Sequence, residues 1–320
     1  MDKLLKKNNR FALLGVAGYI APKHLNAIKV TGHELIAALD PNDSVGVLDS
    51  YFPNTHFFTS FERFERFVVK QKNETPIDYF SICSPNHHHD THCRFALMNG
   101  ANAICEKPLV LNPWNLESLQ RTEAQTGQSI FNILQLRLHP EIIKLKKFVS
   151  ENDEKVYDVD LTYITSRGPW YNISWKGNPE KSGGITSNIG IHFFDMLLWI
   201  FGRVENQSVY ALNDKYASGF LQLKKANVRW FLSVDGNHLS QEVKENGLTV
   251  ERSLTIDNQS FDFSNGFEKL HVKSYENILS GNGFTTNDVA DVIKLGYELR
   301  QSPIVDLNNN CHPLLKNRKL

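Results

Sequence analysis

The feature that most constrains the fold is the pattern of residues 10–40, where two apolar runs flank a glycine-containing turn and a short helix. The first run covers residues 11–14, the turn covers 15–21, and the helix is predicted over 22–28. The second run, residues 34–40, ends in an acidic side chain. Continuous apolar strands of this kind are typical of a parallel sheet that is covered on both faces. The segment therefore predicts a β–α–β unit.

The same alternation continues to about residue 134. Helices are predicted over residues 61–70, 90–98 and 116–125, and strands over 77–83, 101–105 and 129–134. Strands that alternate with helices in this way indicate an α/β domain with a doubly wound parallel sheet. We assign residues 1–130 to this domain, which is of the Rossmann type.

After about residue 150 the strands become one-sided. Residues 156–165 and 228–234 alternate apolar with polar side chains, and shorter strands are predicted over 208–212, 220–223 and 253–256. This pattern predicts a C-terminal α+β domain with an open, mostly antiparallel sheet. We assign residues 131–320 to substrate binding and oligomerisation, and expect the tail after Ser302 to be poorly ordered.

Composition narrows the class of protein. Basic and acidic residues number 35 each, so the formal net charge is zero and no whole-protein field favours nucleic acid or an anionic membrane. No apolar run approaches the roughly 20 residues that cross a bilayer, and the N-terminus lacks the apolar core of a secretory signal. The four cysteines show no paired metal spacing. We therefore expect a cytoplasmic protein with neither nucleic acid nor a membrane as partner.

The turn after the first strand has the composition of a dinucleotide-binding turn. Gly15 and Gly18 are three residues apart, and Tyr19 and Ile20 lead into the helix. Small residues let the backbone approach a pyrophosphate, which the N–H groups and partial positive charge at a helix N-terminus favour. Because the spacing departs from G-x-G-x-x-G, an ordinary strand–helix turn is the alternative interpretation.

Asp40 makes the cofactor interpretation stronger. It closes the second strand about 20 residues after the turn, where a carboxylate can accept hydrogen bonds from an adenosine ribose. The same charge would repel a 2′-phosphate, and no arginine follows in residues 41–43. We therefore predict NAD rather than NADP. The alternative is that Asp40 only forms the turn before Pro41.

A polar segment follows the strand at residues 77–83. Ser84, Pro85 and Asn86 stand at the carboxyl edge of the sheet, where open α/β folds bind ligands. Histidines at positions 87, 88, 89 and 92 come next, but no acidic or cysteine partner stands at a recognised metal spacing. We expect no metal, and predict that His89 lines the ribose side of the nicotinamide pocket.

Two further motifs supply groups that can move a proton. Glu106, Lys107 and Pro108 follow a buried strand, and a partly desolvated lysine there can hydrogen-bond a substrate hydroxyl. Asn188 and His192 are four residues apart in an apolar segment, so we predict that they share one face of an internal helix. An exposed loop lysine and a core histidine are the alternative interpretations.

Together these motifs resemble those of the Gfo/Idh/MocA oxidoreductase family. The resemblance covers nearly the whole chain, and the stretches 18–22, 134–137, 163–168 and 174–177 resemble its WbpB/WlbA branch. It implies NAD-dependent oxidation of the C3 hydroxyl of UDP-2-acetamido-2-deoxy-D-glucuronate, a UDP-sugar acid, to a ketone in bacterial surface-polysaccharide (O-antigen) synthesis. It also implies a homo-oligomer, commonly a tetramer packed through the open sheet.

The resemblance suggests that His192 takes the hydroxyl proton while Lys107 hydrogen-bonds the same oxygen, although the two roles could be reversed. Many family members carry aspartate where this chain has Asn188, and an amide cannot act as a carboxylate base. Asp195 could substitute only if the helix geometry allows it. Two functions remain as alternatives: another sugar or polyol dehydrogenase of the same family, and a catalytically silent NAD-binding regulator.

The remaining predicted site residues are polar or aromatic side chains near the motifs. Glu106 and Gln135 are expected beside the cofactor. Arg137 is expected to position the sugar or the nicotinamide amide. Local cations are needed for the substrate's carboxylate or diphosphate because the chain has no net charge. The candidates for these anions and for the sugar pocket are Arg167, Lys176, Tyr171 and Trp175.

Overall fold

The computed structural model describes residues 8–152, 154–263 and 266–317 of the chain. The chain forms two compact units. Unit 1 consists of Met1–Gln135 and Glu268–Ala290, and unit 2 consists of Leu136–Phe267 and Asp291–Leu320. The chain thus returns to unit 1 for one segment, which the boundary predicted at residue 130 did not include.

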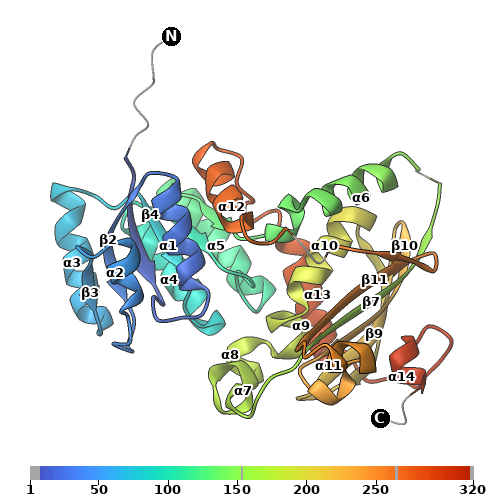
Figure 1. The fold of residues 1–320 in the computed structure, drawn as a ribbon. Helices are drawn as coiled ribbons and strands as arrows, with labels where there is room; N and C mark the ends of the chain where they lie inside the picture. Colours follow the sequence, from blue (N-terminus) through green and yellow to red (C-terminus); the bar gives the residue numbers. More distant parts are fainter. Residues whose placement is uncertain (1–7, 153, 264–265, 318–320) are drawn as a thin grey trace. The chain divides into compact units, whose positions relative to one another are not determined.

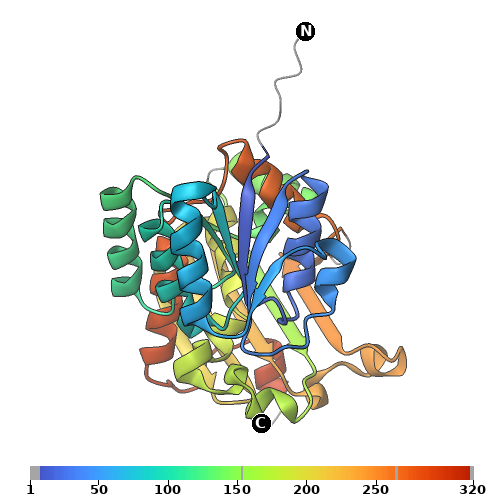
Figure 2. The same cartoon turned by 90° about the vertical axis from the view of Figure 1, so that its left-hand side faces the viewer.

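Unit 1 is a six-stranded parallel sheet with the strand order β3-β2-β1-β4-β5-β6. Helices lie on both faces of the sheet, as Figure 2 shows for this unit. Its strands are β1 (Arg10–Leu14), β2 (Glu34–Leu39), β3 (His56–Phe58), β4 (Tyr79–Ile82), β5 (Asn102–Cys105) and β6 (Ile130–Asn132). Its helices are α1 (Ala21–Val30), α2 (Val47–Tyr51), α3 (Phe61–Glu74), α4 (His89–Met98), α5 (Pro113–Thr126) and α12 (Leu270–Leu279), with a 3-10 turn at Asn86–His88.

This strand order reverses direction between β1 and β4, the position at which doubly wound sheets bind dinucleotides. The strands are buried on both sides because helices cover both faces, and four of the five residues of β1 are fully buried. Phe11 on β1 stacks on Tyr79 of β4 and on Tyr275 of α12, with ring centroids 5.1 and 5.9 Å apart. The returning helix α12 is therefore part of the core of unit 1 (Figure 1).

Unit 2 contains a second six-stranded sheet, in the order β12-β11-β7-β10-β9-β8. Strands β7 and β10 are parallel and the other neighbours are antiparallel, which confirms the predicted open, mostly antiparallel sheet. The strands are β7 (Tyr157–Thr165), β8 (Val204–Leu212), β9 (Tyr216–Leu223), β10 (Ala226–Ser233), β11 (Val250–Ile256) and β12 (Gln259–Phe261). The helices are α6 (Pro140–Ser150), α7 (Trp170–Ile173), α8 (Pro179–Ser182), α9 (Gly184–Asn188), α10 (Ile191–Phe201), α11 (Gln241–Glu245), α13 (Ala290–Gln301) and α14 (Pro313–Asn317), with 3-10 turns at Gln135–Leu138, Trp175–Gly177 and Gly236–His238.

The core of unit 2 lies between α10 and its sheet. The ring of Trp230 on β10 is fully buried and meets Phe194 of α10 edge to face, with centroids 5.2 Å apart. Gly219 lies opposite Trp230 on β9, and a Cβ atom there would come within 2.5 Å of the indole. A glycine is therefore needed on β9 to make room for the largest side chain of this core.

The prediction of a poorly ordered tail is wrong for residues 303–317. Ile304 forms a bridge with Val209 of β8, and α14 follows. Cys311 and Leu315 are buried against Tyr210 and Phe220. Burial of these apolar side chains orders a segment whose polar composition alone suggested a solvated end.

Among the residues that the structure describes, no single helix has the length and apolar composition needed to cross a membrane. The bent pair Pro179–Asn188 and Ile191–Phe201 meets those two criteria only when its members are taken together, with a bend of 44° between them.

Candidate active site

The turn after β1 packs directly on the backbone of the loop after β4. Gly15 has a φ of +88°, and a Cβ atom on it would lie 2.6 Å from both the carbonyl carbon of Cys83 and the amide nitrogen of Ser84. Neither the dihedral angle nor the space suits any other residue. This close approach holds the two loops together at the switch point of the sheet.

Helix α1 begins at the end of this turn. No side chain caps its N-terminus at Ile20. Within the first three positions of the helix, the N–H groups of Ala21 and Lys23 donate to the carbonyl oxygens of Gly18 and Ile20, and the proline between them has no N–H. A helix of 10 residues also carries partial positive charge at this end. Tyr19 in the turn is 95% exposed. The glycine turn and the partial positive charge at this end of α1 therefore fit the pyrophosphate of a dinucleotide.

Asp40 ties the end of β2 to the glycine turn. Its Oδ2 accepts a hydrogen bond from the N–H of Ala17 at 2.9 Å, and its Oδ1 accepts one from the N–H of Asn42 at 2.9 Å. The turn-forming role considered as an alternative is thus real. It is compatible with the ribose role, because an ionised carboxylate offers about four lone-pair sites and these two bonds use half of them. The contact with ribose stays a prediction.

The structure corrects the position of His89. Its ring is completely buried, and its two nitrogens lie 2.8 Å from the carbonyl oxygens of Pro108 and Ser84. Burial lowers the pKa of His89, whereas its bonds to these two carbonyls oppose that change. A ring without exposed surface does not line a pocket; His89 instead joins the loop after β4 to the loop that carries Lys107.

The neighbouring histidines serve local packing. Ser84 Oγ hydrogen-bonds His92 Nδ1 at 2.8 Å, and the ring of His92 stacks on those of Phe61 and His88. Burial, with repulsion from the adjacent histidines, lowers the pKa of His92 to about 3. Within the described ranges, the one group of three potential metal ligands lies elsewhere, at His24, Glu106 and His271.

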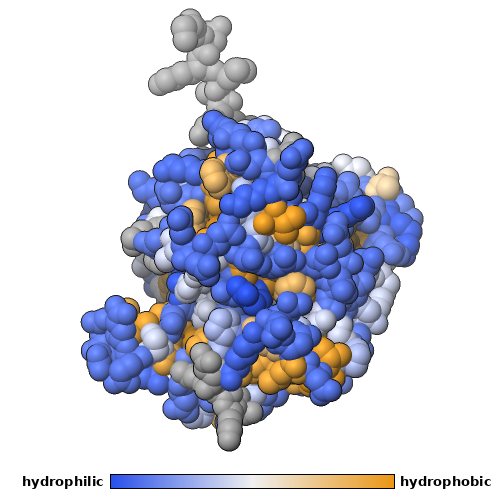
Figure 3. All heavy atoms as spheres, turned by 90° about the vertical axis from the view of Figure 1, so that its right-hand side faces the viewer, coloured by the Kyte–Doolittle hydropathy of each residue, from blue (hydrophilic) through white to orange (hydrophobic). Residues whose placement is uncertain are grey.

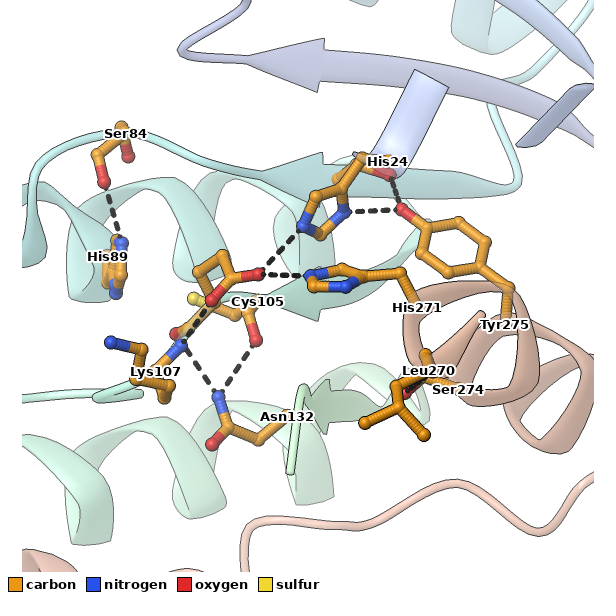
Figure 4. A network of polar contacts seen from close by, with 12 residues as sticks. His24, Ser84, His89, Cys105, Lys107, Asn132, Leu270, His271, Ser274 and Tyr275 are labelled. Atoms are coloured by element: carbon orange, nitrogen blue, oxygen red, sulfur yellow. Dashed lines mark hydrogen bonds and ion pairs between the residues drawn. The ribbon is translucent and has the colours of Figure 1, made fainter. Parts of the chain in front are cut away.

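The loop that carries Lys107 is anchored by side chains on either side (Figure 4). The side-chain amide of Asn132 on β6 donates to the carbonyl oxygens of Cys105 and Glu106 at 2.8 and 3.2 Å. The N–H of Lys107 donates to its neighbour's carboxylate, Glu106 Oε2, at 3.3 Å. The carboxylate of Glu106, predicted to contact the cofactor, points instead into a buried network with His24 and His271. Sequence reasoning missed both histidines because they are 82 and 165 residues away from Glu106 and share no local motif with it.

The prediction that Asn188 and His192 share one helix face is wrong. Asn188 ends α9 and His192 lies in α10, and the chain bends between them. Gly190 stands at the break, where a Cβ atom would lie 2.6 Å from the carbonyl oxygen of Thr186 and 2.7 Å from side-chain atoms of Leu232 and Phe194. Tight packing against the sheet thus separates two residues whose spacing suggested a single helix.

The carboxamide of Asn188 and the carboxylate of Asp195, both predicted near His192, form hydrogen bonds with other side chains of unit 2. Asn188 donates from Nδ2 to the hydroxyl of Tyr171 at 3.0 Å. Asp195 accepts two hydrogen bonds from Arg137, at 3.0 Å from Nε and 2.7 Å from an Nη atom. This pair is almost fully buried, and breaking such a pair costs about 3–5 kcal/mol. The carboxylate of Asp195 is therefore already paired with Arg137, and its role beside His192 stays a prediction.

Two predicted anion ligands lie in the segment before α9. The ammonium group of Lys176 stands over the rings of Trp175 and Trp170, 4.8 and 5.6 Å from their centroids. Burial and repulsion from Arg167 lower the pKa of Lys176. An anion bound between these cations would relieve that repulsion. The cluster therefore fits a carboxylate or a phosphate.

Comparison with known proteins agrees with this geometry. Residues 9–133 match the model of the oxidoreductase family with an NAD-binding Rossmann fold, and residues 152–251 match the model of its C-terminal alpha/beta domain. The chain belongs to the Gfo/Idh/MocA oxidoreductase family. The first of these models describes an NAD-binding domain, so NAD is the cofactor, as the position of Asp40 predicted.

Two solved structures of the WlbA (WbpB) dehydrogenase from Thermus thermophilus are similar to this chain. One, with NAD and alpha-ketoglutarate, has a TM-score of 0.93, and the other, with NAD and UDP-GlcNAcA, has 0.92. Both are 44% identical to this chain, over 96% of it and 100% of their own length. The inositol 2-dehydrogenase of Rhizobium meliloti is 27% identical over 201 residues, which is 61% of this chain and 55% of that relative.

The position of Asp40 yields a prediction about cofactor choice. We expect Asp40→Ser to weaken NAD binding by about 10–100-fold, because it removes a charged hydrogen-bond acceptor worth about 1.5–3 kcal/mol. Affinity for NADP should rise relative to NAD because the charge that repels a 2′-phosphate is lost. Quenching of tryptophan fluorescence by each dinucleotide measures both constants. An unchanged NAD/NADP ratio would leave Asp40 with its turn-forming role alone.

Proposed function

We propose that this protein catalyses the NAD-dependent oxidation of the C3 hydroxyl of UDP-2-acetamido-2-deoxy-D-glucuronate. The observation that carries the proposal is the 44% identity, over 96% of this chain, with a dehydrogenase solved with NAD and UDP-GlcNAcA. The hydroxyl group on C3 loses its proton to the protein. The hydrogen bound to the C3 carbon leaves as hydride. The products are the 3-keto sugar, NADH and one proton.

In the proposed reaction Lys107 and His192 act on the substrate oxygen. His192 accepts the hydroxyl proton, and Lys107 hydrogen-bonds the oxygen and stabilises the developing alkoxide. NAD supplies the hydride acceptor. Asn188 is assigned to orientation of the sugar rather than to proton transfer, because an amide has no basic oxygen at neutral pH and its Nδ2 donates to Tyr171.

The substrate carries a carboxylate and a diphosphate, and Arg167 and Lys176 are the cations proposed to bind the carboxylate. Their mutual repulsion supports this assignment, since an anion between them would stabilise both charges. Tyr171 and Trp175 are proposed to line the sugar pocket. Gln135 and Arg137 are proposed to lie on the nicotinamide side, with Arg137 held in orientation by Asp195.

We further propose that the enzyme is a cytoplasmic homotetramer that prepares a sugar for bacterial surface polysaccharide. A surface of unit 2 supports an interface between copies. The segment beside β8 exposes Ile304, Val305 and Leu307 by 59, 41 and 57%, which is unusual for three large apolar residues so close in sequence. Figure 3 shows hydrophobic patches set among hydrophilic side chains on one face of the molecule.

The proposed catalytic pair has a direct test. Lys107→Met and His192→Asn should each lower kcat for UDP-2-acetamido-2-deoxy-D-glucuronate by about 10²–10⁴-fold, the contribution expected of a positioned proton-transfer group. NAD affinity should change by no more than about 3-fold. NADH absorbance follows turnover, with Lys144→Met on the exposed face of α6 as a control. Near-normal turnover in both variants would refute the mechanism, and faster turnover of a free polyol would refute the substrate.

The role of Lys176 is tested with two substrates that differ only in the carboxylate. Lys176→Met should raise KM for the sugar acid by about 10–100-fold, because a charge-assisted hydrogen bond is worth about 1.5–3 kcal/mol. KM or Ki for UDP-N-acetylglucosamine, which lacks the carboxylate, should stay the same. Equal losses for both ligands would assign Lys176 to the diphosphate instead. Lys181→Met, at an exposed position of the nearby helix α8, is the matched control.

The oligomer is tested by light scattering during gel filtration. We expect a mass of about four chains for the natural protein. Replacement of Ile304 and Leu307 by lysine should shift the mass toward smaller species, because desolvating introduced charges in an interface is costly. A monomeric natural protein would contradict the proposed tetramer without affecting the proposed chemistry.

A further inference from the structure

The carboxylate of Glu106 is held by histidines from two distant parts of the chain. Its Oε1 lies 3.0 Å from Nε2 of His24 on α1 and 3.1 Å from Nε2 of His271 on α12. Both histidines are buried, and Glu106 is only 7% exposed. Figure 4 shows the two rings converging on one carboxylate oxygen between α1, the end of β5 and the returning helix.

The protonation states of this cluster follow from its contacts. Burial alone would raise the pKa of Glu106, but the hydrogen bonds from His24 and His271 outweigh it and hold the pKa well below its usual value. Burial lowers the pKa of His24. Glu106 is therefore ionised and His24 is neutral at physiological pH.

Donor directions along the network are consistent with that assignment. An ionised carboxylate only accepts, so His24 donates from Nε2 and its Nδ1 must accept. The hydroxyl of Tyr275 lies 2.7 Å from this Nδ1 and donates to it. Ser81 Oγ lies 2.6 Å from the same Tyr275 oxygen and donates in turn. Each of these buried groups is satisfied without an additional ligand.

The second oxygen of Glu106 connects this network to the Lys107 loop. Glu106 Oε2 accepts the N–H of Lys107 at 3.3 Å, and the carbonyl of Glu106 accepts from Asn132. The peptide that leads into Lys107 is thus held from both sides. A rotation of the Glu106 carboxylate would break the bond to this peptide, so the histidines constrain the backbone from which the Lys107 side chain projects.

Helix α12 completes the network from the returning segment. His271 and Tyr275 are four residues apart and so lie on the same face of α12. Their rings meet the His24 ring edge to face, with centroids 5.3 and 5.6 Å away. One turn of this helix therefore supplies both a donor to Glu106 and the partner that fixes the tautomer of His24.

We propose that His24 and His271 are positioning residues for the reaction, which hold Glu106 and through it the backbone of Lys107. The inference rests on the proposed function only in taking Lys107 as a catalytic residue. Helix α12 lies outside every motif that identifies the family in this chain. In this proposal it contributes to turnover rather than to cofactor binding.

A divalent cation is the competing explanation, because the three potential ligand atoms lie within 4.8 Å of one another. A cation would need the Nε2 lone pairs of both histidines, whereas the ionised carboxylate needs their protons. Metal binding would also reverse the bonds from His24 through Tyr275 to Ser81. The two explanations therefore make opposite predictions about metal content.

The test compares three replacements at one position. His271→Gln keeps a donor near the Nε2 position, whereas His271→Asn is too short to reach Glu106 and His271→Leu has no donor. We expect Leu and Asn to lower kcat by about 10–100-fold, as displacement of a reacting group by about 1 Å does. Gln should restore kcat to within about 3-fold of the natural enzyme, and NAD affinity should stay within about 3-fold in all three.

A pH profile supplies a readout that a purely structural role would not change. Loss of the His271 donor raises the pKa of Glu106, so the acidic limb of the kcat profile should move to higher pH in His271→Asn but not in His271→Gln. Several other titratable groups interact with Glu106 and stay the same in both variants. They are His24 of α1, Cys83 after β4, His89 of α4, Cys105 of β5 and Tyr275 of α12.

His33→Leu is the matched control, since it removes another buried histidine of unit 1 that accepts from the N–H of Asn9 instead of touching Glu106. Its kcat should be unchanged. Equal kcat in the Gln, Asn and Leu variants would overturn the positioning role. The positioning role would also be overturned if mass spectrometry found about one equivalent of zinc bound to the natural protein and none bound to His271→Leu. If Lys107→Met also retains turnover, the proposed function fails; if only the His271 variants retain it, this inference fails alone.

Discussion

The buried charge of Glu106 is the interaction on which unit 1 depends. A carboxylate in a protein interior loses its hydration, and removal of a partner from such a buried charge costs about 3–5 kcal/mol. Its donors come from α1, from α12 and from the peptide of Lys107. No single element supplies them all. The glycine turn that starts α1, the end of β5 and the returning helix must therefore be in place together before the charge is satisfied.

Stability alone does not account for this arrangement. Replacing a whole buried charged cluster by well-packed apolar side chains is often neutral or stabilising, so an apolar cluster could also have joined these three elements. The charge instead fixes the orientation of the Glu106 carboxylate. A carboxylate held by two donors on one oxygen presents the other oxygen at a defined position, and here that position is occupied by the N–H of Lys107. The network thus has a cost in desolvation and a benefit in geometry.

The fold could be predicted further than the site. The strands of unit 1 are continuous apolar runs and those of unit 2 alternate, and both patterns are local properties of the chain. The helix α12 was not predicted as part of unit 1 because its contacts with β1 and α1 join residues more than 240 positions apart. Sequence spacing also placed Asn188 and His192 on one helix. Only the packing of Gly190 against Leu232 and Phe194 shows why the helix bends there.

Sequence motifs identified candidate site residues, but they did not identify the hydrogen-bond and ion-pair partners of those residues. His89 belongs to a motif, yet its two bonds to the backbone carbonyls of Ser84 and Pro108 make it a link between loops. Asp195 was considered as a partner for His192, yet its carboxylate is paired with Arg137, 58 residues earlier in the chain. A motif identifies the type of side chain that a reaction needs. Which of its atoms remain available is decided by long-range contacts that leave no periodic signal.

Long-range contacts also distinguish Arg137 from Arg167 and Lys176, the three cations predicted to bind the substrate. The charge of Arg137 is paired with that of Asp195 inside unit 2, so we propose that Arg137 presents a guanidinium of fixed orientation rather than a free cation. Lys176 and Arg167 repel each other, and burial adds to the cost of keeping Lys176 charged. An anion at that position would relieve the repulsion, whereas one beside Arg137 would compete with an existing carboxylate. In a chain whose total charge is zero, we propose that these two like charges supply the local attraction for an acidic sugar.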